Sequence, residues 1–271
     1  METNNKANFN WYPGHMAKTR RQIENDLKII DVVIELLDAR IPMASRNPDI
    51  KKLTQNKRRI ILLNKCDLAD EVSNSKWVSK LSKEAPTILT DSNSGKGIDK
   101  VTKKVEELMQ EDLAIQAARG RKNKTIRVMI LGIPNVGKSS FINRIAKKNT
   151  AEVGNRPGVT RQKQWIRIGK NQELLDTPGV LWPKFESEEV ALNLAYTGTI
   201  KDDLIERYKL NDSDLNDIEN SSNPMYTLMQ IIGQKRGALI SGGNTDDEKV
   251  ARIILDDFRS GKLGRITLEQ L

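Results

Sequence analysis

The chain has 271 residues, of which 37% are hydrophobic and 30% charged, a composition typical of one large or two ordinary globular domains. A membrane-spanning helix needs about 18 consecutive apolar residues, and no apolar run in the chain approaches this length. The polar N-terminus lacks a secretory signal. The single cysteine, Cys66, excludes an intrachain disulfide and a cysteine zinc cluster. We therefore expect a soluble, cytoplasmic protein.

The net charge of +9 is unevenly distributed along the chain. Residues 1–186 carry 35 Lys and Arg against 21 Asp and Glu, a balance of +14, whereas residues 187–271 carry 10 against 15, a balance of −5. Excess positive charge attracts polyanions, and RNA is the commonest of these in the cytoplasm. The pattern favours contact with nucleic acid, with a solvated basic surface as the alternative.

The first 186 residues alternate between helical and strand patterns. Helical spacing predicts helices over 13–28, 47–56, 74–84, 97–118 and 139–148. Dense apolar runs predict strands over 30–40, 58–65, 85–90 and 125–132. Two further strands, 163–169 and 171–177, are expected to form a hairpin about Gly169. Such alternation predicts an α/β fold with a mostly parallel sheet.

After about residue 186 the pattern changes to amphipathic helices without a convincing strand. These helical stretches cover residues 187–200, 201–210, 223–239 and 246–264. The sequence "SGGN" at 241–244 separates the last two. We therefore predict two domains, an α/β domain over residues 1–186 and a small all-α domain over residues 187–271.

The segment "GIPNVGKS", residues 132–139, matches the phosphate-binding pattern Gly-x4-Gly-Lys-Ser between a strand and a helix. Its backbone N–H groups and the helix N-terminus are suited to bind phosphates. Lys138 is expected to reach the β- and γ-phosphates and Ser139 to ligate Mg²⁺. The nucleotide-binding residues predicted here are Asn135, Val136, Gly137, Lys138, Ser139 and Ser140.

A second motif, Asp176-Thr177-Pro178-Gly179, follows about 40 residues later at a strand end. Asp176 is placed to hold Mg²⁺ through water, and the Gly179 N–H can meet a γ-phosphate that only the triphosphate provides. Thr160, in the intervening "NRPGVTRQ", is the candidate switch threonine that closes over Mg²⁺. A plain turn is the alternative for the four-residue motif.

The base-reading motif is Asn64-Lys65-Cys66-Asp67, also at a strand end. The Asp67 carboxylate can accept hydrogen bonds from guanine N1–H and the 2-amino group, which adenine does not offer in that arrangement. Asn64 can bond the base and brace the loop, while the Lys65 stem covers the base face. In "TDSNSGKG", residues 90–97, Asp91 and Ser92 are predicted to lie near guanine O6, although such a cluster commonly marks only a loop.

The motifs occur in the order base, base backup, phosphate, switch one, switch two, which is a cyclic rotation of the usual GTPase order. Chain ends that lie close together can be joined and the ring reopened elsewhere. The new joint is predicted within residues 97–124 and the new opening just after Gly179. The helical region then follows the segment that senses the γ-phosphate, so nucleotide state can reorient it.

Two other functional classes compete with a GTPase. A P-loop ATPase or nucleoside kinase would share the phosphate loop, but Asn64 to Asp67 argues against it. A non-catalytic RNA-binding module would have a degenerate nucleotide site, whereas Lys138, Ser139, Thr160 and Asp176 are all present.

The chain resembles the circularly permuted GTPases of ribosome assembly, and within them the ribosome biogenesis GTPase A family. The resemblance rests on "WYPGHMAK", "DARIP", "NKCDL", "GIPNVGKSS", "RPGVT", "DTPG" and "RSGKLGRITLE". It implies a Ras-like permuted domain and an ANTAR-like helical domain that contacts RNA. It further implies binding to precursor 50S subunits through ribosomal RNA and particle-stimulated GTP hydrolysis as a switch in late assembly. We expect the free protein to be a monomer.

The resemblance also suggests how the attacking water is placed. Many GTPases use a glutamine directly after Asp-x-x-Gly, but Val180 and Leu181 stand here, as in the family. The family points to His15 as the catalytic histidine, with a structural or RNA-contacting histidine as the alternative. Asn135 resembles the asparagine that ligates K⁺ in cation-dependent members, so K⁺ is an expected second cation beside Mg²⁺.

Overall fold

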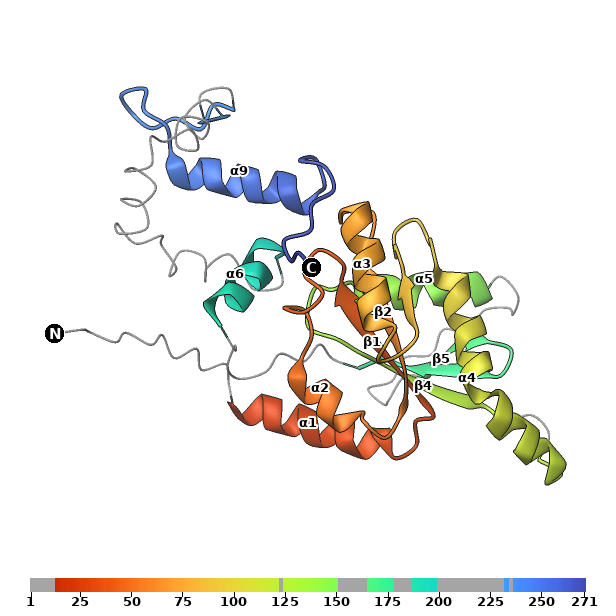
Figure 1. The fold of residues 1–271 in the computed structure, drawn as a ribbon. Helices are drawn as coiled ribbons and strands as arrows, with labels where there is room; N and C mark the ends of the chain where they lie inside the picture. The colour runs from red at the N-terminus through yellow and green to blue at the C-terminus, as the bar shows by residue number, and fades with distance from the viewer. Residues whose placement is uncertain (1–12, 122–123, 151–164, 178–186, 199–231, 234–235) are drawn as a thin grey trace.

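The computed structural model describes residues 13–121, 124–150, 165–177, 187–198, 232–233 and 236–271. Their centre is one six-stranded sheet with the order β3-β2-β1-β4-β6-β5 (Figure 1). The strands are β1 (Val32–Asp38), β2 (Arg58–Asn64), β3 (Thr87–Leu89), β4 (Ile126–Leu131), β5 (Trp165–Gly169) and β6 (Gln172–Leu175).

All strand pairs of this sheet are parallel except β5 with β6. The central strand β1 pairs on both sides, so that Val32 lies opposite Arg58 of β2 and Val128 of β4. Every residue of β1 is buried, because helices cover both faces of the sheet. This explains the continuous apolar runs, which are typical of parallel strands.

Seven described helices surround or extend the sheet (Figure 1). They are α1 (Pro13–Leu27), α2 (Pro48–Leu53), α3 (Glu71–Leu81), α4 (Ile98–Ala118), α5 (Lys138–Thr150), α6 (Glu188–Tyr196) and α9 (Asp247–Arg259). Side chains before four of them, Asn47, Asp70, Ser187 and Asp246, accept from backbone N–H groups of the first turn, as N-caps do.

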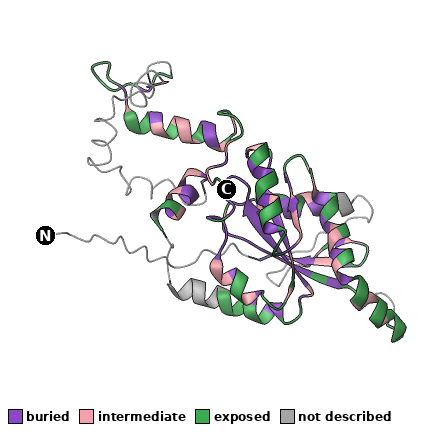
Figure 2. Ribbon diagram, in the orientation of Figure 1, coloured by how far each residue is buried: buried purple, intermediate pink, exposed green. Residues whose placement is uncertain are grey.

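Alternate residues of the strands supply apolar clusters to the two faces. Figure 2 shows that the strands of the sheet are largely buried. Ile34 and Leu36 of β1 share a cluster with residues of α4 and α5, whereas Val33 lies with Ile23 and Leu27 of α1. A third cluster joins Leu37, Ile61 and Leu63 to Trp77 and Leu81 of α3. The period-two alternation therefore assigns each helix to a face.

The predicted parallel sheet and the hairpin about Gly169 are confirmed. Helices α2 and α9 are shorter than predicted. Helix α2 covers only Pro48–Leu53 of the expected 47–56. Helix α9 ends at Arg259, because Gly261 adopts φ +78° and stops the helix expected to reach residue 264. The expected helix over 201–210 and nearly all of that over 223–239 lie outside the described residues. No helix among the described residues is long and apolar enough to cross a membrane.

The part of the chain after residue 186 contacts the sheet domain. Leu194 of α6 belongs to the main apolar cluster, and Leu268 packs against that cluster. The division into domains 1–186 and 187–271 stays a prediction.

Candidate functional site

The predicted site residues follow the carboxyl ends of the parallel strands. Because these ends meet at one edge of a sheet, they form the usual ligand-binding edge of an α/β fold. The parallel strands β1, β2, β3, β4 and β6 each end at or just before one residue of this edge. In the same order, these residues are Asp38, Asn64, Asp91, Gly132 and Asp176. The fold therefore brings the base-reading and phosphate motifs together although about 70 residues separate them.

The phosphate loop requires glycine at two positions. A Cβ on Gly137, which adopts φ +97°, would stand 2.4 Å from Asn64 Nδ2. A Cβ on Gly132 would stand 2.6 Å from the Leu36 carbonyl oxygen. Helix α5 begins at Lys138, directly after the loop, so its first N–H groups face the same edge.

Lys138 is buried at the start of α5. Its Nζ donates to the Gly132 carbonyl at 3.0 Å and to the Ile133 carbonyl at 2.8 Å. Burial lowers the pKa of Lys138 to about 8, although the nearby Asp176 carboxylate opposes this change. The side chain is thus held within the loop, and phosphate oxygens would stabilise the charged form that burial disfavours.

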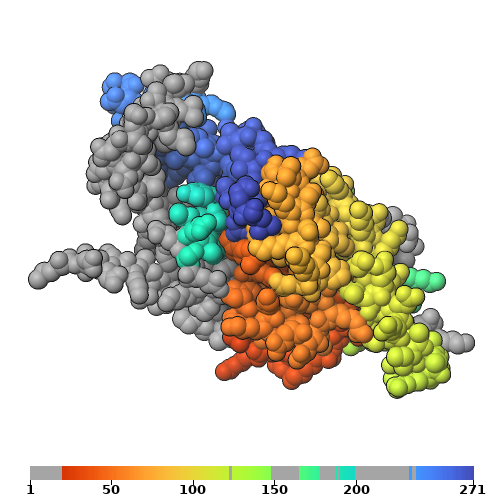
Figure 3. Space-filling model, viewed as in Figure 1, coloured from red at the N-terminus to blue at the C-terminus, as the bar shows by residue number. Residues whose placement is uncertain are grey.

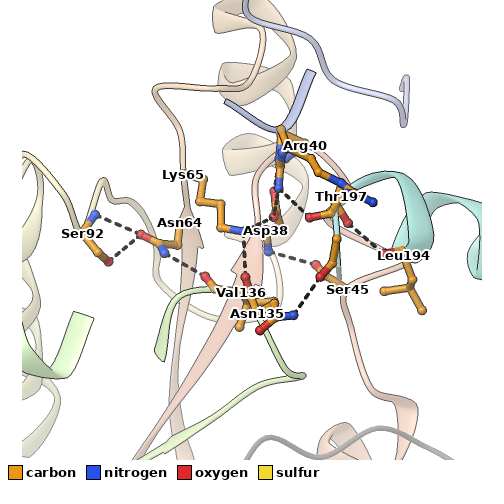
Figure 4. Close-up of polar contacts among 12 residues, drawn as sticks. Asp38, Arg40, Ser45, Asn64, Lys65, Ser92, Asn135, Val136, Leu194 and Thr197 are labelled. Carbon is orange, nitrogen blue, oxygen red and sulfur yellow. Dashed lines mark hydrogen bonds and ion pairs between the residues drawn. The ribbon is translucent and has the colours of Figure 1, made fainter. Parts of the chain in front are cut away.

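Asn64 connects three loops (Figure 4). Its Nδ2 donates to the Val136 carbonyl of the phosphate loop at 2.8 Å. Its Oδ1 accepts from the Ser92 hydroxyl at 2.8 Å, the Ser92 N–H at 3.2 Å and the Thr90 hydroxyl at 3.3 Å. Because Asn64 is itself buried, these bonds fix the base-reading and phosphate loops relative to one another.

Lys65 makes a second connection to the phosphate loop. Its Nζ donates to the Asn135 carbonyl at 2.7 Å and lies 3.1 Å from Asp38 Oδ2 (Figure 4). Both Lys65 and Asn135 adopt φ +59°, an uncommon conformation for residues with a side chain. The two loops therefore hold each other in a strained backbone conformation.

Asp38 and Arg40 form a fully buried ion pair beside this contact. Arg40 donates to both carboxylate oxygens, from Nε at 2.9 Å and Nη2 at 2.7 Å. Burial acts to raise the pKa of Asp38, but the Lys65 charge and the Arg40 hydrogen bonds outweigh it, so the pKa is lowered. The carboxylate is consequently charged and positions Lys65.

The Asp67 side chain is exposed at the outer side of the base-reading loop. Partial burial raises its pKa, and the charge of Asp91 adds to this effect, while Arg265 and Arg40 oppose it. The Asp91 carboxylate accepts from the N–H groups of Asn93 at 2.8 Å and Ser94 at 3.2 Å. Asp91 therefore shapes its own loop, and Ser92 is the residue of that loop that contacts Asn64.

The predicted magnesium ligands are only partly described. Ser139 and Asp176 are exposed at the edge, and one hydroxyl with one carboxylate is an oxygen donor set that fits Mg²⁺ when phosphate and water complete it. Partial burial raises the pKa of Asp176, against the effect of Lys138. No cluster of three His, Cys, Asp or Glu side chains suited to a metal occurs in the described ranges.

Thr160, Gly179, Val180 and Leu181 lie outside the described residues. His15 belongs to the first turn of α1, but its side chain is likewise outside the described part.

Neither Arg40 nor the end of α6 belongs to a motif that predicts a role at the site. Arg40 Nη2 donates to the Thr197 carbonyl at 3.4 Å, and Asn135 Nδ2 donates to the Gly198 carbonyl at 2.8 Å. The end of α6 therefore lies against the phosphate loop. The sequence signal that could have identified Arg40 is "DARIP", in which an arginine follows two residues after the aspartate that ends a strand.

Comparisons with known proteins agree with this geometry. The family model described as "50S ribosome-binding GTPase" matches residues 127–230. Ribosome biogenesis GTPase A of Bacillus licheniformis is 45% identical, over 96% of this chain and 97% of its own length.

Two solved structures of YlqF from T. maritima are also similar. The GNP-bound form has a TM-score of 0.67 and 28% identity, covering 93% of this chain and 98% of that one. The GDP-bound form has a TM-score of 0.68 and 29% identity, covering 92% and 99%. These similarities, together with the mostly parallel sheet, the phosphate loop at Gly132 and the base-reading loop at Asn64 of this chain, lead to one conclusion. The chain belongs to the ribosome biogenesis GTPase A family, and it is a GTP-hydrolysing enzyme with a circularly permuted GTPase domain.

Proposed function

We propose that this protein binds the precursor of the large ribosomal subunit, contacts its ribosomal RNA, and hydrolyses GTP as a switch in late assembly when the particle stimulates it. The observation that carries the nucleotide part is the Asn64 side chain, which joins the base-reading loop to the phosphate loop through the Val136 carbonyl. The particle part is supported by the relatives, whose names place them in ribosome biogenesis.

The nucleotide would span the edge of the sheet. Asp67 accepts from the guanine N1–H and 2-amino groups, with Lys65 against the base and Ser92 near O6. Lys138 and the N–H groups of the phosphate loop bind the β- and γ-phosphates. Lys138 now donates to two loop carbonyls, so it is already positioned and exchanges these partners for phosphate oxygens.

Two cations belong to the proposal. Mg²⁺ would be held by Ser139, by Asp176 through water and by Thr160, and it supplies charge neutralisation to the phosphates. K⁺ would be held by Asn135. Gly179 would contact the γ-phosphate, and His15 would orient the attacking water once the particle orders its surroundings.

The charge distribution supports an RNA partner. Residues 1–186 hold the whole positive excess, and the α1 residues Arg20 and Arg21 are exposed. A basic surface of this kind binds phosphate backbones with an affinity that falls with salt. We propose that this polyanion is the ribosomal RNA of the precursor particle, because the names of the relatives place those proteins in ribosome biogenesis.

Sedimentation tests this function. The full chain is mixed with purified large-subunit precursors in the presence of a non-hydrolysable GTP analogue, GDP or ATP, and the pelleted fraction and the GTP hydrolysis rate are measured. We expect the analogue to give the largest pelleted fraction and the particle to raise the hydrolysis rate about tenfold or more.

The matched control is Lys138→Met, which removes the phosphate contact at the nucleotide site. The pelleted fraction of this variant should be the same with the GTP analogue, GDP and ATP. Equal pelleting in the analogue and GDP states, together with an unstimulated rate, would contradict the proposal.

A further inference from the structure

The last residues of the chain return to the base-reading loop. After α9, residues 261–271 run back over the GTPase domain, and Figure 3 shows these dark blue residues against the orange surface of the sheet domain. Gly261 lies directly on Leu68, since a Cβ at Gly261 would stand 2.7 Å from Leu68 Cδ2. The Ile266 N–H donates to the Leu68 carbonyl at 3.0 Å. The C-terminal tail, residues 261–271, and the base-reading loop therefore pair through their backbones.

Arg265 makes the most direct contact between the two segments. Its Nη2 donates to the Cys66 carbonyl at 3.1 Å, and its Nε donates to the Ala69 carbonyl at 2.9 Å. These carbonyls flank Asp67, one residue before it and two after it. A planar guanidinium that binds two carbonyls fixes their separation and direction.

The same two carbonyls are held from the inside of the domain. Asn74 Nδ2 of α3 donates to the Cys66 carbonyl at 3.0 Å and to the Ala69 carbonyl at 3.4 Å. The Leu68 N–H closes the turn on the Lys65 carbonyl at 3.0 Å. The backbone that carries Asp67 thus lies between a buried amide and the Arg265 guanidinium.

Further contacts hold the tail in this position. The Thr267 hydroxyl accepts from the Asp70 N–H at 3.0 Å, and the Leu268 N–H donates to the Arg40 carbonyl at 2.9 Å. The Glu269 carboxylate accepts from the Met43 N–H at 2.6 Å and the Ala44 N–H at 2.7 Å. Arg265 is therefore supported by a docked segment that makes its own contacts.

We propose that Arg265 is a positioning residue for guanine recognition, which holds the 66–69 backbone so that both Asp67 carboxylate oxygens meet the base. This inference rests on the proposed role of Asp67. The two hydrogen bonds from the Asp67 carboxylate to guanine N1–H and the 2-amino group tolerate little rotation of the carboxylate. Hydrogen bonds weaken steeply as the donor–hydrogen–acceptor angle decreases. The C-terminal tail thereby becomes part of the base specificity site.

The test compares Arg265→Met with wild type, and it measures the affinities for GDP and for inosine diphosphate, which lacks the 2-amino group. GDP binding should weaken about tenfold, and inosine diphosphate binding should weaken less, because it can use only one of the two Asp67 contacts. The GDP to inosine diphosphate affinity ratio should therefore fall. Arg265→Lys retains the charge and one donor direction, so it should recover part of the ratio.

Arg236→Met is the matched control. Arg236 is similarly exposed and pairs with Asp257 in the C-terminal region, away from the base-reading loop. It should leave both nucleotide affinities unchanged. Thermal unfolding of all variants shows whether a loss of stability accompanies any change.

The outcomes separate the two assignments. If Asp67→Ala abolishes the preference for GDP but Arg265→Met leaves the ratio unchanged, only the role of Arg265 is overturned. The role of Arg265 is also overturned if Arg265→Met weakens both nucleotides equally. If Asp67→Ala has no effect on the preference, the base site itself is misassigned and the inference falls with it.

Discussion

At the scale of single residues, the proposed nucleotide site is built from side chains that bind the protein's own backbone. Asn64 and Lys65 both bind carbonyls of the phosphate loop, at Val136 and Asn135. Lys138 binds carbonyls of the same loop. Polar groups that are fixed in this way need little reorganisation when a ligand arrives.

The lowered pKa of Lys138, together with its proposed phosphate contact, predicts that GDP affinity depends on pH. The free protein has a pKa of about 8 at this residue because of burial, and bound phosphates will raise it by attraction. Above that pKa, binding must therefore take up a proton, whereas well below it the lysine is already charged. We expect GDP affinity to fall about tenfold between about pH 7 and about pH 9.

Titration of GDP binding at several pH values checks this expectation. Lys138→Met should bind weakly and should show only the slope that the nucleotide itself contributes. A wild-type affinity that follows the variant's slope would mean that Lys138 carries its charge throughout this range.

Asn135 leads to a prediction about monovalent cations. Its Nδ2 is engaged with the Gly198 carbonyl, so the amide oxygen is the atom that can coordinate K⁺. Replacing Na⁺ with K⁺ should raise the particle-stimulated GTPase rate several-fold, because a site sized for the larger K⁺ would hold that positive charge beside the phosphates better than it holds Na⁺. The rate is measured at constant ionic strength. In the control variant Asn135→Ala, the rates in Na⁺ and K⁺ should be equal. Equal wild-type rates in the two salts would contradict a K⁺ site.

At the scale of elements, the end of β1 connects the sheet to helices α6 and α9. Arg40 contacts the Thr197 carbonyl after α6, and its guanidinium lies 5.4 Å from the ring centre of Phe258 in α9. Arg259 of α9 donates to the Tyr196 carbonyl at 3.1 Å. The helices therefore meet at the buried Asp38 pair, close to the phosphate loop.

Arg40→Met should be strongly destabilising. It leaves the Asp38 carboxylate fully buried with only Lys65 as a charged partner, and breaking a buried pair typically costs about 3–5 kcal/mol. Urea denaturation measures the change in the free energy of unfolding. Asp38→Asn added to Arg40→Met should recover part of the loss, because it removes the buried charge.

Arg58→Met is the control for this comparison. Arg58 pairs with Asp112 at 2.8 Å, but both side chains are more than a third exposed, so the expected cost is within about 1 kcal/mol. A loss for Arg40→Met no larger than that of Arg58→Met would show that the buried pair does not hold these elements together.

At the scale of the whole molecule, the chain order and the spatial order differ. Strands β1 and β4 are neighbours in the sheet although β2, β3 and the long helix α4 separate them in sequence (Figure 1). Helix α1 packs on this central pair, and the C-terminal tail lies on the base-reading loop. The helical C-terminal part is therefore attached at two places of the nucleotide site, the phosphate loop through Gly198 and the base loop through Arg265.

The sequence by itself determined the parallel sheet, the phosphate loop and the rotated motif order. These are local signals, since apolar runs define strands and the Gly-x4-Gly-Lys-Ser spacing defines the loop between β4 and α5. It also indicated that Asp67 and Lys138 serve one ligand, because the carboxyl ends of parallel strands share an edge.

Only the tertiary structure decided how the loops and the C-terminal part are connected. The bonds from Asn64 to Val136 and from Arg265 to Cys66 join residues 72 and 199 positions apart. No local pattern encodes such pairs, because an exposed arginine in a glycine-rich tail is typical of a solvated charge. Burial of backbone carbonyls that need donors, which depends on the folded arrangement, is what selects these partners.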